Sequence, residues 1–244
     1  MIGPVIGAVI GRALRLAMAL SCLAVPGAAM AQAYQCSAPA TIGPLPRIEP
    51  DGPPVRTAIG GYVLAASWSP EYCRKGNTAA SMQCSGANGR FGFVLHGLWP
   101  EAASGPSPQW CAALPMPSPA LVRRNLCMTP VPWLLAHEWA KHGTCMAKRP
   151  EDYYAVSARL WRRLAWPDAD RLSRKPDLTA GDLRAAFVEA NLDWRPEQVG
   201  ILASNTGWLR EIQICMDRKF RPRPCPARMF GPPGAATLKI WRGL

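Results

Sequence analysis

Nine cysteines in a chain of 244 residues constrain the fold more than any other sequence feature. Cys22 lies in a segment with the pattern of an export signal, so eight cysteines remain in the exported chain. An even number behind such a signal predicts up to four disulfide bonds in an oxidising compartment. Spacing alone does not choose the pairs. No CxxC pair occurs, which argues against a cysteine-based zinc site.

The N-terminal segment is the basis for expecting export. Two arginines precede an apolar stretch over 16–25, and small residues at 27–31 provide a cleavage site. We expect a secretory signal peptide over residues 1–31; the alternatives are an N-terminal anchor helix or a lipoprotein signal at Cys22. Beyond it, no apolar run reaches the ~18 residues that a membrane span needs. We therefore expect a periplasmic or secreted protein, without stable membrane insertion once the signal is removed.

The charge is strongly positive. The formal net charge is +12, and removing residues 1–31 takes away two arginines and no acids, which leaves +10. An exported basic protein favours a polyanionic partner such as nucleic acid, anionic lipid or acidic glycan. The alternative is a solvated basic surface without a specific partner. We expect the arginine pairs 123–124 and 162–163 to act only as diffuse steering charges.

The pattern of elements predicts one α+β domain with a mainly antiparallel central sheet flanked by helices and held by disulfides. A Pro/Gly-rich N-terminal arm covers 32–59, and the catalytic domain covers 60–244. In the first half of the domain we expect loops at 74–90 and 101–119, and His96 at the end of its strand beside a turn at Gly97. Apolar or alternating runs predict strands at 62–68, 91–96 and 209–216, and capping and periodicity predict helices at 132–142, 151–165 and 180–190.

All three histidines lie in two short segments, 96–100 (HGLWP) and 137–145 (HEWAKHGTC). On a helix, His137 stacks with Lys141 and Glu138 stacks with His142, so Glu138 is expected to orient His142 and raise its basicity. A zinc protease needs histidines four residues apart, but here the spacing is five, and Lys141 would repel the ion. A cysteine protease would use Cys145, which a disulfide better explains.

Two imidazoles, a lysine and a basic surface suit the cleavage of a phosphodiester whose nucleophile comes from the substrate. RNA supplies that nucleophile as its 2′-OH; DNA lacks it and would not be cut this way. One histidine takes the 2′ proton, the other protonates the 5′-oxygen, and a cation stabilises the transition state. No cofactor and no metal are needed.

The two histidine segments resemble the signature segments of the T(2)-type ribonuclease family. The stretch 62–73 and the strand expected at 209–217 resemble neighbouring family segments, so the resemblance runs from about Gly60 to Asp217. It implies an endoribonuclease of weak base preference that cleaves single-stranded RNA through a 2′,3′-cyclic phosphate to a 3′-phosphate. We expect the protein to be a monomer and RNA to be its partner.

The resemblance also implies a role for each matching residue. His142 would be the general base and His96 the general acid, while Glu138 and Lys141 would stabilise the transition state. His137 would help to bind a phosphate or the downstream nucleotide. Two further residues would bind the substrate, Trp99 by stacking on a base and Glu101 by contacting one. Glu101 stands where many relatives have Asp, which leaves base preference open.

Two disulfides are implied on the same basis, Cys111–Cys145 and Cys73–Cys84. For the four cysteines that remain we take Cys36–Cys127 and Cys215–Cys225 as one pairing, and their connectivity stays open. Trp133 and Trp139 are expected to pack in the core. Two other hypotheses remain open from the residues. One is a non-catalytic module that binds RNA or an anionic surface, and the other is a metal-dependent hydrolase.

Overall fold

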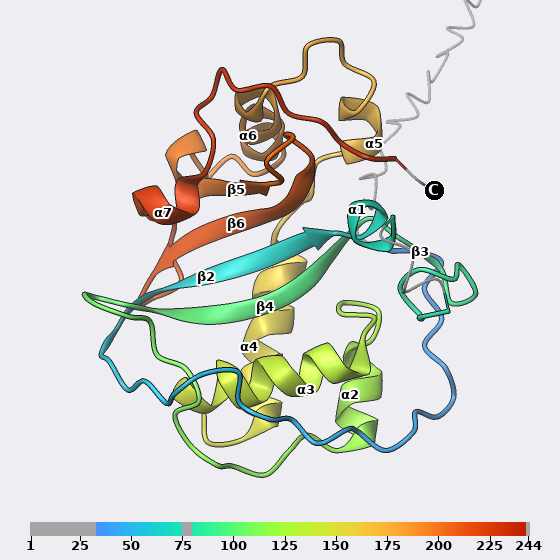
Figure 1. Ribbon diagram of the computed structural model, residues 1–244, viewed down its shortest axis with the longest axis vertical. Helices are drawn as coiled ribbons and strands as arrows, with labels where there is room; N and C mark the ends of the chain where they lie inside the picture. The colour runs from blue at the N-terminus through green and yellow to red at the C-terminus, as the bar shows by residue number, and fades with distance from the viewer. Residues whose placement is uncertain (1–32, 75–79, 243–244) are drawn as a thin grey trace, which may run out of the picture.

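An antiparallel sheet of four strands, in the order β4-β2-β6-β5, forms the centre of the protein (Figure 1). The computed structural model describes residues 33–74 and 80–242. A separate two-stranded sheet pairs β1 with β3. This architecture confirms the predicted α+β fold. The strands are β1 Ala33–Tyr34, β2 Ile59–Trp68, β3 Arg90–Phe91, β4 Phe93–Ala102, β5 Val199–Ala203 and β6 Leu209–Asp217.

One face of the central sheet packs on helices. Leu64 of β2 pairs with Leu98 of β4 and Ile214 of β6, and all three side chains are fully buried. Burial of this apolar face is the main driving force for the fold. The helices are α1 Ser69–Cys73, α2 Pro119–Asn125, α3 Pro132–Lys141, α4 Pro150–Arg163, α5 Ala169–Leu172, α6 Ala180–Ala190 and α7 Ala227–Phe230, with 3₁₀ turns Gly143–Cys145 and Pro196–Gln198.

Elements with strong sequence signals are confirmed. The helix expected at 180–190 has those bounds, and Thr179 and Asp182 form the capping box in which each side chain accepts the other's backbone N–H. The helix expected at 132–142 starts at Pro132 and ends one residue earlier, at Lys141. The strands expected at 62–68 and 209–216 are also present, within β2 and β6.

The strand that carries His96 is longer than predicted. We expected it to end at His96, but β4 continues through Gly97 to Ala102. Leu95 lies opposite Ala66 of β2 and Gly97 lies opposite Ala65, so His96 is the extra residue of a β-bulge and has no partner on β2. The strand continues past Gly97 because β2 pairs with it on both sides of the bulge.

The position of β4 in the sheet also explains why a proline does not end it. Pro100 lacks the N–H that a central strand would need for pairing on both sides. Because β4 is at the edge of the sheet, Pro100 is tolerated within the strand.

Helix α2 and strand β5 are among the elements that were not predicted. Helix α2 begins at the end of the segment that we expected to be loop, where Ser118 caps it by accepting the N–H of Leu121. Strand β5 pairs with β6 at the far edge of the sheet. Its five residues are too few to show a clear period, so pairing with a longer strand decides its conformation.

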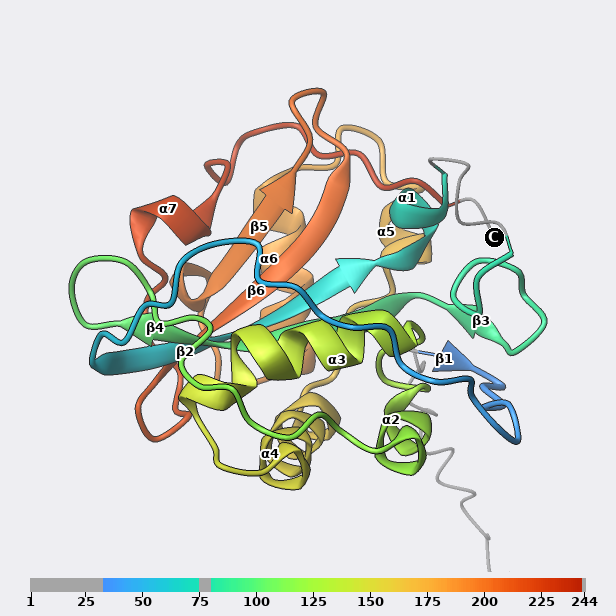
Figure 2. The same cartoon turned by 60° about the horizontal axis from the view of Figure 1, so that its bottom comes forward.

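Four disulfides hold the domain together. They include the two pairs that the resemblance implies, and the other four cysteines, whose connectivity was open, form Cys36–Cys127 and Cys215–Cys225. Cys73–Cys84 closes the loop after α1, and Cys111–Cys145 ties the end of α3 to the segment after β4. Cys215–Cys225 joins β6 to the segment that follows it. Cys36–Cys127 fastens the N-terminal arm, which crosses α3 in Figure 2.

The N-terminal arm is irregular between β1 and β2, and it is fixed to the domain. Val55 forms an isolated bridge with Gln109, and Arg56 donates to the carbonyl of Cys111. The signal peptide expected at 1–31 lies outside the described residues. Within 33–74 and 80–242, no helix is long and apolar enough to cross a membrane.

Candidate active site

The site forms where the edge strand β4 meets helix α3. Gly97 makes this approach possible, because a Cβ at that position would lie 1.9 Å from Oε2 of Glu138 and 2.6 Å from Nε1 of Trp99. Those distances are shorter than any van der Waals contact. The glycine therefore lets a carboxylate of α3 reach the strand that carries His96 and Trp99, where the Trp99 indole donates to Glu138 at 2.7 Å.

His96 is surrounded by carboxylates. Its Nδ1 lies 2.7 Å from Oε2 of Glu211 on β6, and its Nε2 lies 3.6 Å from Oε1 of Glu138. Burial alone would lower the pKa of His96, but the hydrogen bond with Glu211 and the charges of both carboxylates outweigh it and raise that pKa to about 9. His96 is therefore protonated at neutral pH.

The two carboxylates differ in their own protonation. Burial raises the pKa of Glu138 to about 7, against the opposing effects of His96 and Trp99. Burial would also raise the pKa of Glu211, but the hydrogen bond and charge of His96 outweigh it and hold that pKa below its usual range. Glu211 is thus the ionised partner of His96, and Ser67 and Gln213 also donate to its carboxylate.

His142 lies next to a cation instead. Burial is the main cause that lowers its pKa to about 3, and the positive charge of Lys141 acts in the same direction. The imidazole is therefore neutral at neutral pH. Its Nδ1 is buried without a hydrogen-bond partner among the residues described.

Glu138 does not make the contact that we expected of it. We expected it to orient His142 and raise its basicity, but its carboxylate contacts Trp99 and His96, and the pKa of His142 is lowered. The cause is the end of the helix: α3 stops at Lys141, and His142 has φ −110°, outside the helical range that the four-residue stacking assumes.

Lys141 and His137 share a partner from the N-terminal arm. Lys141 Nζ lies 2.7 Å from Oδ2 of Asp51, and His137 Nε2 lies 3.9 Å from the same oxygen. The Trp110 indole donates to Oδ1 of Asp51 at 3.1 Å. The hydrogen bond from Lys141 lowers the pKa of Asp51, so an ionised carboxylate lies beside Lys141. Burial lowers the pKa of His137, so its imidazole is neutral.

The aromatic residues of the site differ from expectation at one position. Trp139 is fully buried in the core, as expected, but Trp133 is 46% exposed, so its assignment to the core was wrong. Its ring stacks on His137, with centroids 4.9 Å apart and planes at 23°. The buried face of α3 includes Leu135, and Trp133 lies about 200° from it around the helix, so its ring points away from the core.

A hollow of about 240 Å³ opens beside His96. Tyr72 and Trp133 contribute its aromatic wall, and Ser67 and Gln83 contribute polar groups. Tyr72 is 44% exposed, so both rings present surface to a ligand. An aromatic and partly polar hollow of this kind suits a planar, hydrogen-bonding group.

The structure places the expected site residues in one region with one exception. Trp99 lies between the imidazoles, with ring centroids 5.1 Å from His96 and 5.7 Å from His142. Glu101 lies further along β4, buried and paired with Arg228 of α7. Its role in contacting a base remains a prediction.

No group of three or more His, Cys, Asp or Glu side chains in the described part of the chain is arranged to hold a metal ion. Instead, the negative and positive side chains of this site lie apart. Two carboxylates lie at His96, and one lysine lies next to His142. That arrangement suits proton transfer beside a developing negative charge.

Residues 59–225 match the model of the ribonuclease T2 family. The chain is 34% identical over 197 residues to a Haemophilus influenzae protein named "Probable ribonuclease", covering 72% of this chain and 65% of that protein. It is 33% identical over 165 residues to a "Ribonuclease" of Aeromonas hydrophila, covering 65% of this chain and 72% of that one. The chain therefore belongs to the ribonuclease T2 family.

Solved structures share the fold. Trichomaglin, described as an S-like ribonuclease, has a TM-score of 0.58 at 21% identity, covering 69% of this chain and 92% of that one. RNase NT, solved in complex with 5′-AMP, has a TM-score of 0.59 at 17% identity, covering 75% and 98%. At these identities the likeness establishes the architecture.

Several residues of the site were not singled out from the sequence, among them Glu211, Asp51 and Trp110. Glu211 lies in the predicted strand 209–216, where a carboxylate among apolar residues was a usable signal. Asp51 and Trp110 lie in segments that we expected to be irregular arm and loop. No periodicity marks either one, and only the fold brings them to His137 and Lys141.

Proposed function

We propose that this protein is an exported, metal-independent endoribonuclease of weak base preference. It cleaves single-stranded RNA by acid–base transphosphorylation. The observation that carries the proposal is the opposite protonation of two imidazoles in one site, with the pKa of His96 raised to about 9 and that of His142 lowered to about 3. A reaction that removes one proton and delivers another at the same pH needs one neutral and one protonated group.

In the first step, neutral His142 takes the proton of the 2′-OH, and the 2′-oxygen attacks the adjacent phosphorus. The bond from phosphorus to the 5′-oxygen breaks, and protonated His96 gives its proton to that leaving oxygen. The products are a 2′,3′-cyclic phosphate and a free 5′-OH. In the second step the roles reverse, water opens the cyclic phosphate, and a 3′-phosphate remains.

Lys141 stabilises the negative charge that develops on the phosphate oxygens, and His137 binds a phosphate or the downstream nucleotide. Glu138 helps to stabilise the transition state at the phosphate through its contacts with His96 and Trp99. Trp99 lies between the two imidazoles and offers its ring to a base. Glu211 is a positioning residue, because it holds the protonated form of His96 without reaching the substrate itself.

The hollow beside His96 receives the base of the leaving nucleoside. The leaving 5′-oxygen must lie near His96, and the hollow lined by Tyr72 and Trp133 is an aromatic surface next to that imidazole. Stacking on exposed rings tolerates any base, which is consistent with weak base preference. DNA offers no 2′-OH and is not cut.

Export is supported by two features. Four disulfides form in the described domain, and such bonds persist in oxidising compartments. The segment 1–31 has the pattern of a signal peptide. We propose a periplasmic or secreted monomer, and N-terminal sequencing of the exported protein tests the cleavage site before Gln32.

The function is tested with the purified, oxidised protein and its His142→Ala variant, on polymeric RNA in excess chelator. The expected result is cutting by the wild type and loss of cutting in the variant. Equal activity of the two proteins would contradict the mechanism, and a protein that retains RNA without cutting it would indicate a binding module. Loss of wild-type activity in chelator would indicate a metal-dependent hydrolase.

A further inference from the structure

Two tryptophans and two cations form a cluster beyond the active site. The rings of Trp208 and Trp241 meet edge to face at 6.0 Å. The Arg74 guanidinium lies 4.6 Å from the centre of the Trp208 ring and 5.1 Å from that of Trp241. The ammonium of Lys239 lies 5.8 Å from the Trp208 ring. We call these four residues the tryptophan cluster.

The tryptophan cluster opens to solvent. Trp241 is 38% exposed. A hollow of about 540 Å³ adjoins it, and Trp208, Lys239 and Arg242 line this hollow together with Lys175 and one acid, Asp177. The balance of charge around the hollow is therefore positive.

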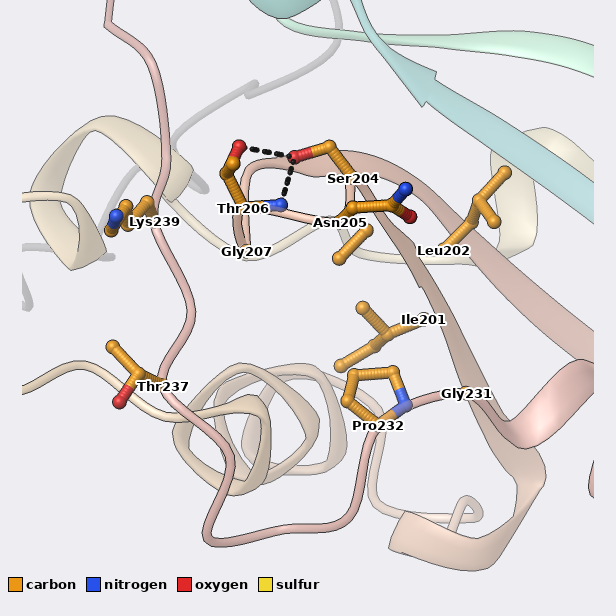
Figure 3. A pocket seen from close by; sticks show the side chains of 11 residues that line it. Ile201, Leu202, Ser204, Asn205, Thr206, Gly207, Gly231, Pro232, Thr237 and Lys239 are labelled. Carbon is orange, nitrogen blue, oxygen red and sulfur yellow. Dashed lines mark hydrogen bonds between the residues drawn. The ribbon is translucent and has the colours of Figure 1, made fainter.

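A second hollow, of about 530 Å³, continues from the first and shares Thr237 and Lys239 with it. Figure 3 shows the turn from Ser204 to Gly207, which lines this second hollow beside the C-terminal segment that carries Thr237 and Lys239. Hydroxyl and amide groups of the turn thus extend the polar surface away from the tryptophans.

We infer that the tryptophan cluster is a subsite for single-stranded RNA on the 3′ side of the bond that is cut. The exposed ring of Trp241 offers a face on which a base of any sequence can stack, and the half-buried ring of Trp208 borders it. The neighbouring cations can neutralise phosphates. This inference rests on the proposed function. His96 is there the acid that protonates the leaving 5′-oxygen, so the RNA on the His96 side of the site is the part that lies 3′ of the bond that is cut.

The position of the cluster agrees with that direction. Tyr72 of α1 lines the hollow beside His96, and Arg74 follows directly after α1 and contacts both tryptophans. On the chain that forms β6, Trp208 lies three residues before Glu211, which holds His96; that is roughly 10 Å along an extended chain. A strand that leaves the active site past Tyr72 therefore meets Arg74 and Trp208 next.

The tryptophans also have a structural role that the test must separate. The Trp68 indole donates to the carbonyl of Trp241 at 2.7 Å, so truncation of Trp241 also loosens the C-terminal segment. Arg74 is paired with Glu71 at 3.4 Å. The test therefore removes the charges of Lys239 and Arg242, which are exposed.

The test compares the double variant Lys239→Gln/Arg242→Gln with the control Arg124→Gln/Arg162→Gln. Both lose two positive charges, and the control charges are exposed on α2 and α4. The substrates each contain one ribonucleotide, either as a dinucleotide or within a strand extended by deoxynucleotides on the 3′ side or on the 5′ side. The measured quantity is kcat/KM for each substrate.

The expected result is a loss of about fivefold or more in the Lys239/Arg242 variant on the 3′-extended strand only. Its kcat/KM on the dinucleotide and on the 5′-extended strand stays at the wild-type value. The control variant loses less than the Lys239/Arg242 variant on the 3′-extended strand. Equal losses in the two double variants, or a loss confined to the 5′-extended strand, would overturn the inference.

Binding of an all-deoxy strand tests the same subsite when no cleavage occurs. The slope of log affinity against log salt should fall by about 1.4 in magnitude for the Lys239/Arg242 variant, because two phosphate contacts are lost. A protein that cuts no RNA but shows this change contradicts the proposed function and leaves the subsite standing. An unchanged slope contradicts the subsite.

Discussion

The two histidines proposed to be catalytic occupy regions of opposite charge. His96 lies in a carboxylate region, formed with Glu211 and Glu138, and its pKa rises to about 9. His142 lies in a cation region, next to Lys141, and burial together with that positive charge lowers its pKa to about 3. The same side chain is thus protonated in one region and neutral in the other at neutral pH, and the difference comes from its surroundings.

The two regions also have different structural origins. The carboxylate region depends on the sheet, because antiparallel pairing places Ser67 of β2 opposite Glu211 of β6 and the bulge in β4 frees His96 to turn toward that carboxylate. The cation region depends on the end of α3 and on the N-terminal arm, which contributes Asp51. The first is held by strand register, and the second by a helix terminus and a disulfide-fastened arm.

Removing either histidine should have the largest effect. We expect His142→Ala and His96→Ala each to lower kcat/KM on RNA by about 10²- to 10⁴-fold, the usual contribution of a general base or acid. The melting temperature of each variant is the control for folding. Retention of more than a tenth of the activity in either folded variant would contradict the assigned role.

The carboxylate region predicts a specific change in the pH profile. His96 must be protonated, so kcat/KM should fall as the pH rises through its pKa near 9. Glu211→Gln removes the negative charge that raises this pKa, so the alkaline limb should move to lower pH. At a pH above 9, where most of His96 is deprotonated in both proteins, each unit by which its pKa falls should lower the activity about tenfold.

The control for Glu211→Gln is the acidic limb, which belongs to His142 in the other region. His142 must be neutral, so activity is lost as the pH falls through its lowered pKa, and this limb should not move. Glu138 and Lys141 also face His96 and stay in place in this variant, so a shift of the alkaline limb reports the loss of the Glu211 charge. A uniform loss at all pH values, with both limbs unmoved, would mean that Glu211 is only structural.

Gly97→Ala should disturb the boundary between the two regions. The added Cβ would lie 1.9 Å from the Glu138 carboxylate, which must therefore move away from His96 and Trp99. We expect a loss of about 1–3 kcal/mol of unfolding free energy, the usual cost of overpacking. Denaturant unfolding measures it. A variant as stable as the wild type would show that β4 and α3 separate easily.

The smallest effect is expected at Asp51. Asp51→Asn removes the carboxylate that pairs with Lys141, so the lysine becomes free for the substrate phosphate. Because the Asp51 side chain is half exposed, we expect KM to fall by only about two- to fivefold. Asp152→Asn, which breaks an exposed ion pair on α4, is the matched control. A lower kcat in Asp51→Asn would show instead that Asp51 positions Lys141.

Both regions could be predicted only in part from the sequence, for different reasons. His96, Glu138, Lys141 and His142 lie in two short segments, which is why the sequence singled them out. The contact that helical spacing predicted between Glu138 and His142 is wrong, because α3 ends at Lys141. The bulge at His96 was not predictable, because an apolar strand pattern does not show where one residue is inserted against its partner.

The rest of the site depends on contacts between distant parts of the chain. Glu211 reaches His96 across 115 residues, and Asp51 reaches Lys141 across 90. The fold class, the sheet direction and the capped helix at 180–190 followed from local patterns. The short strand β5 and the exposed side of Trp133 did not, since each is determined by how a neighbouring element packs or pairs.

The most direct test of the central claim uses polymeric RNA and DNA of matched length, incubated with the oxidised protein in excess chelator. The ends of the products are then identified. We predict that only RNA is cut, first to 2′,3′-cyclic phosphate and then to 3′-phosphate ends. Failure of the folded protein to cut either polymer, or cutting of DNA as well, would contradict acid–base catalysis by His96 and His142.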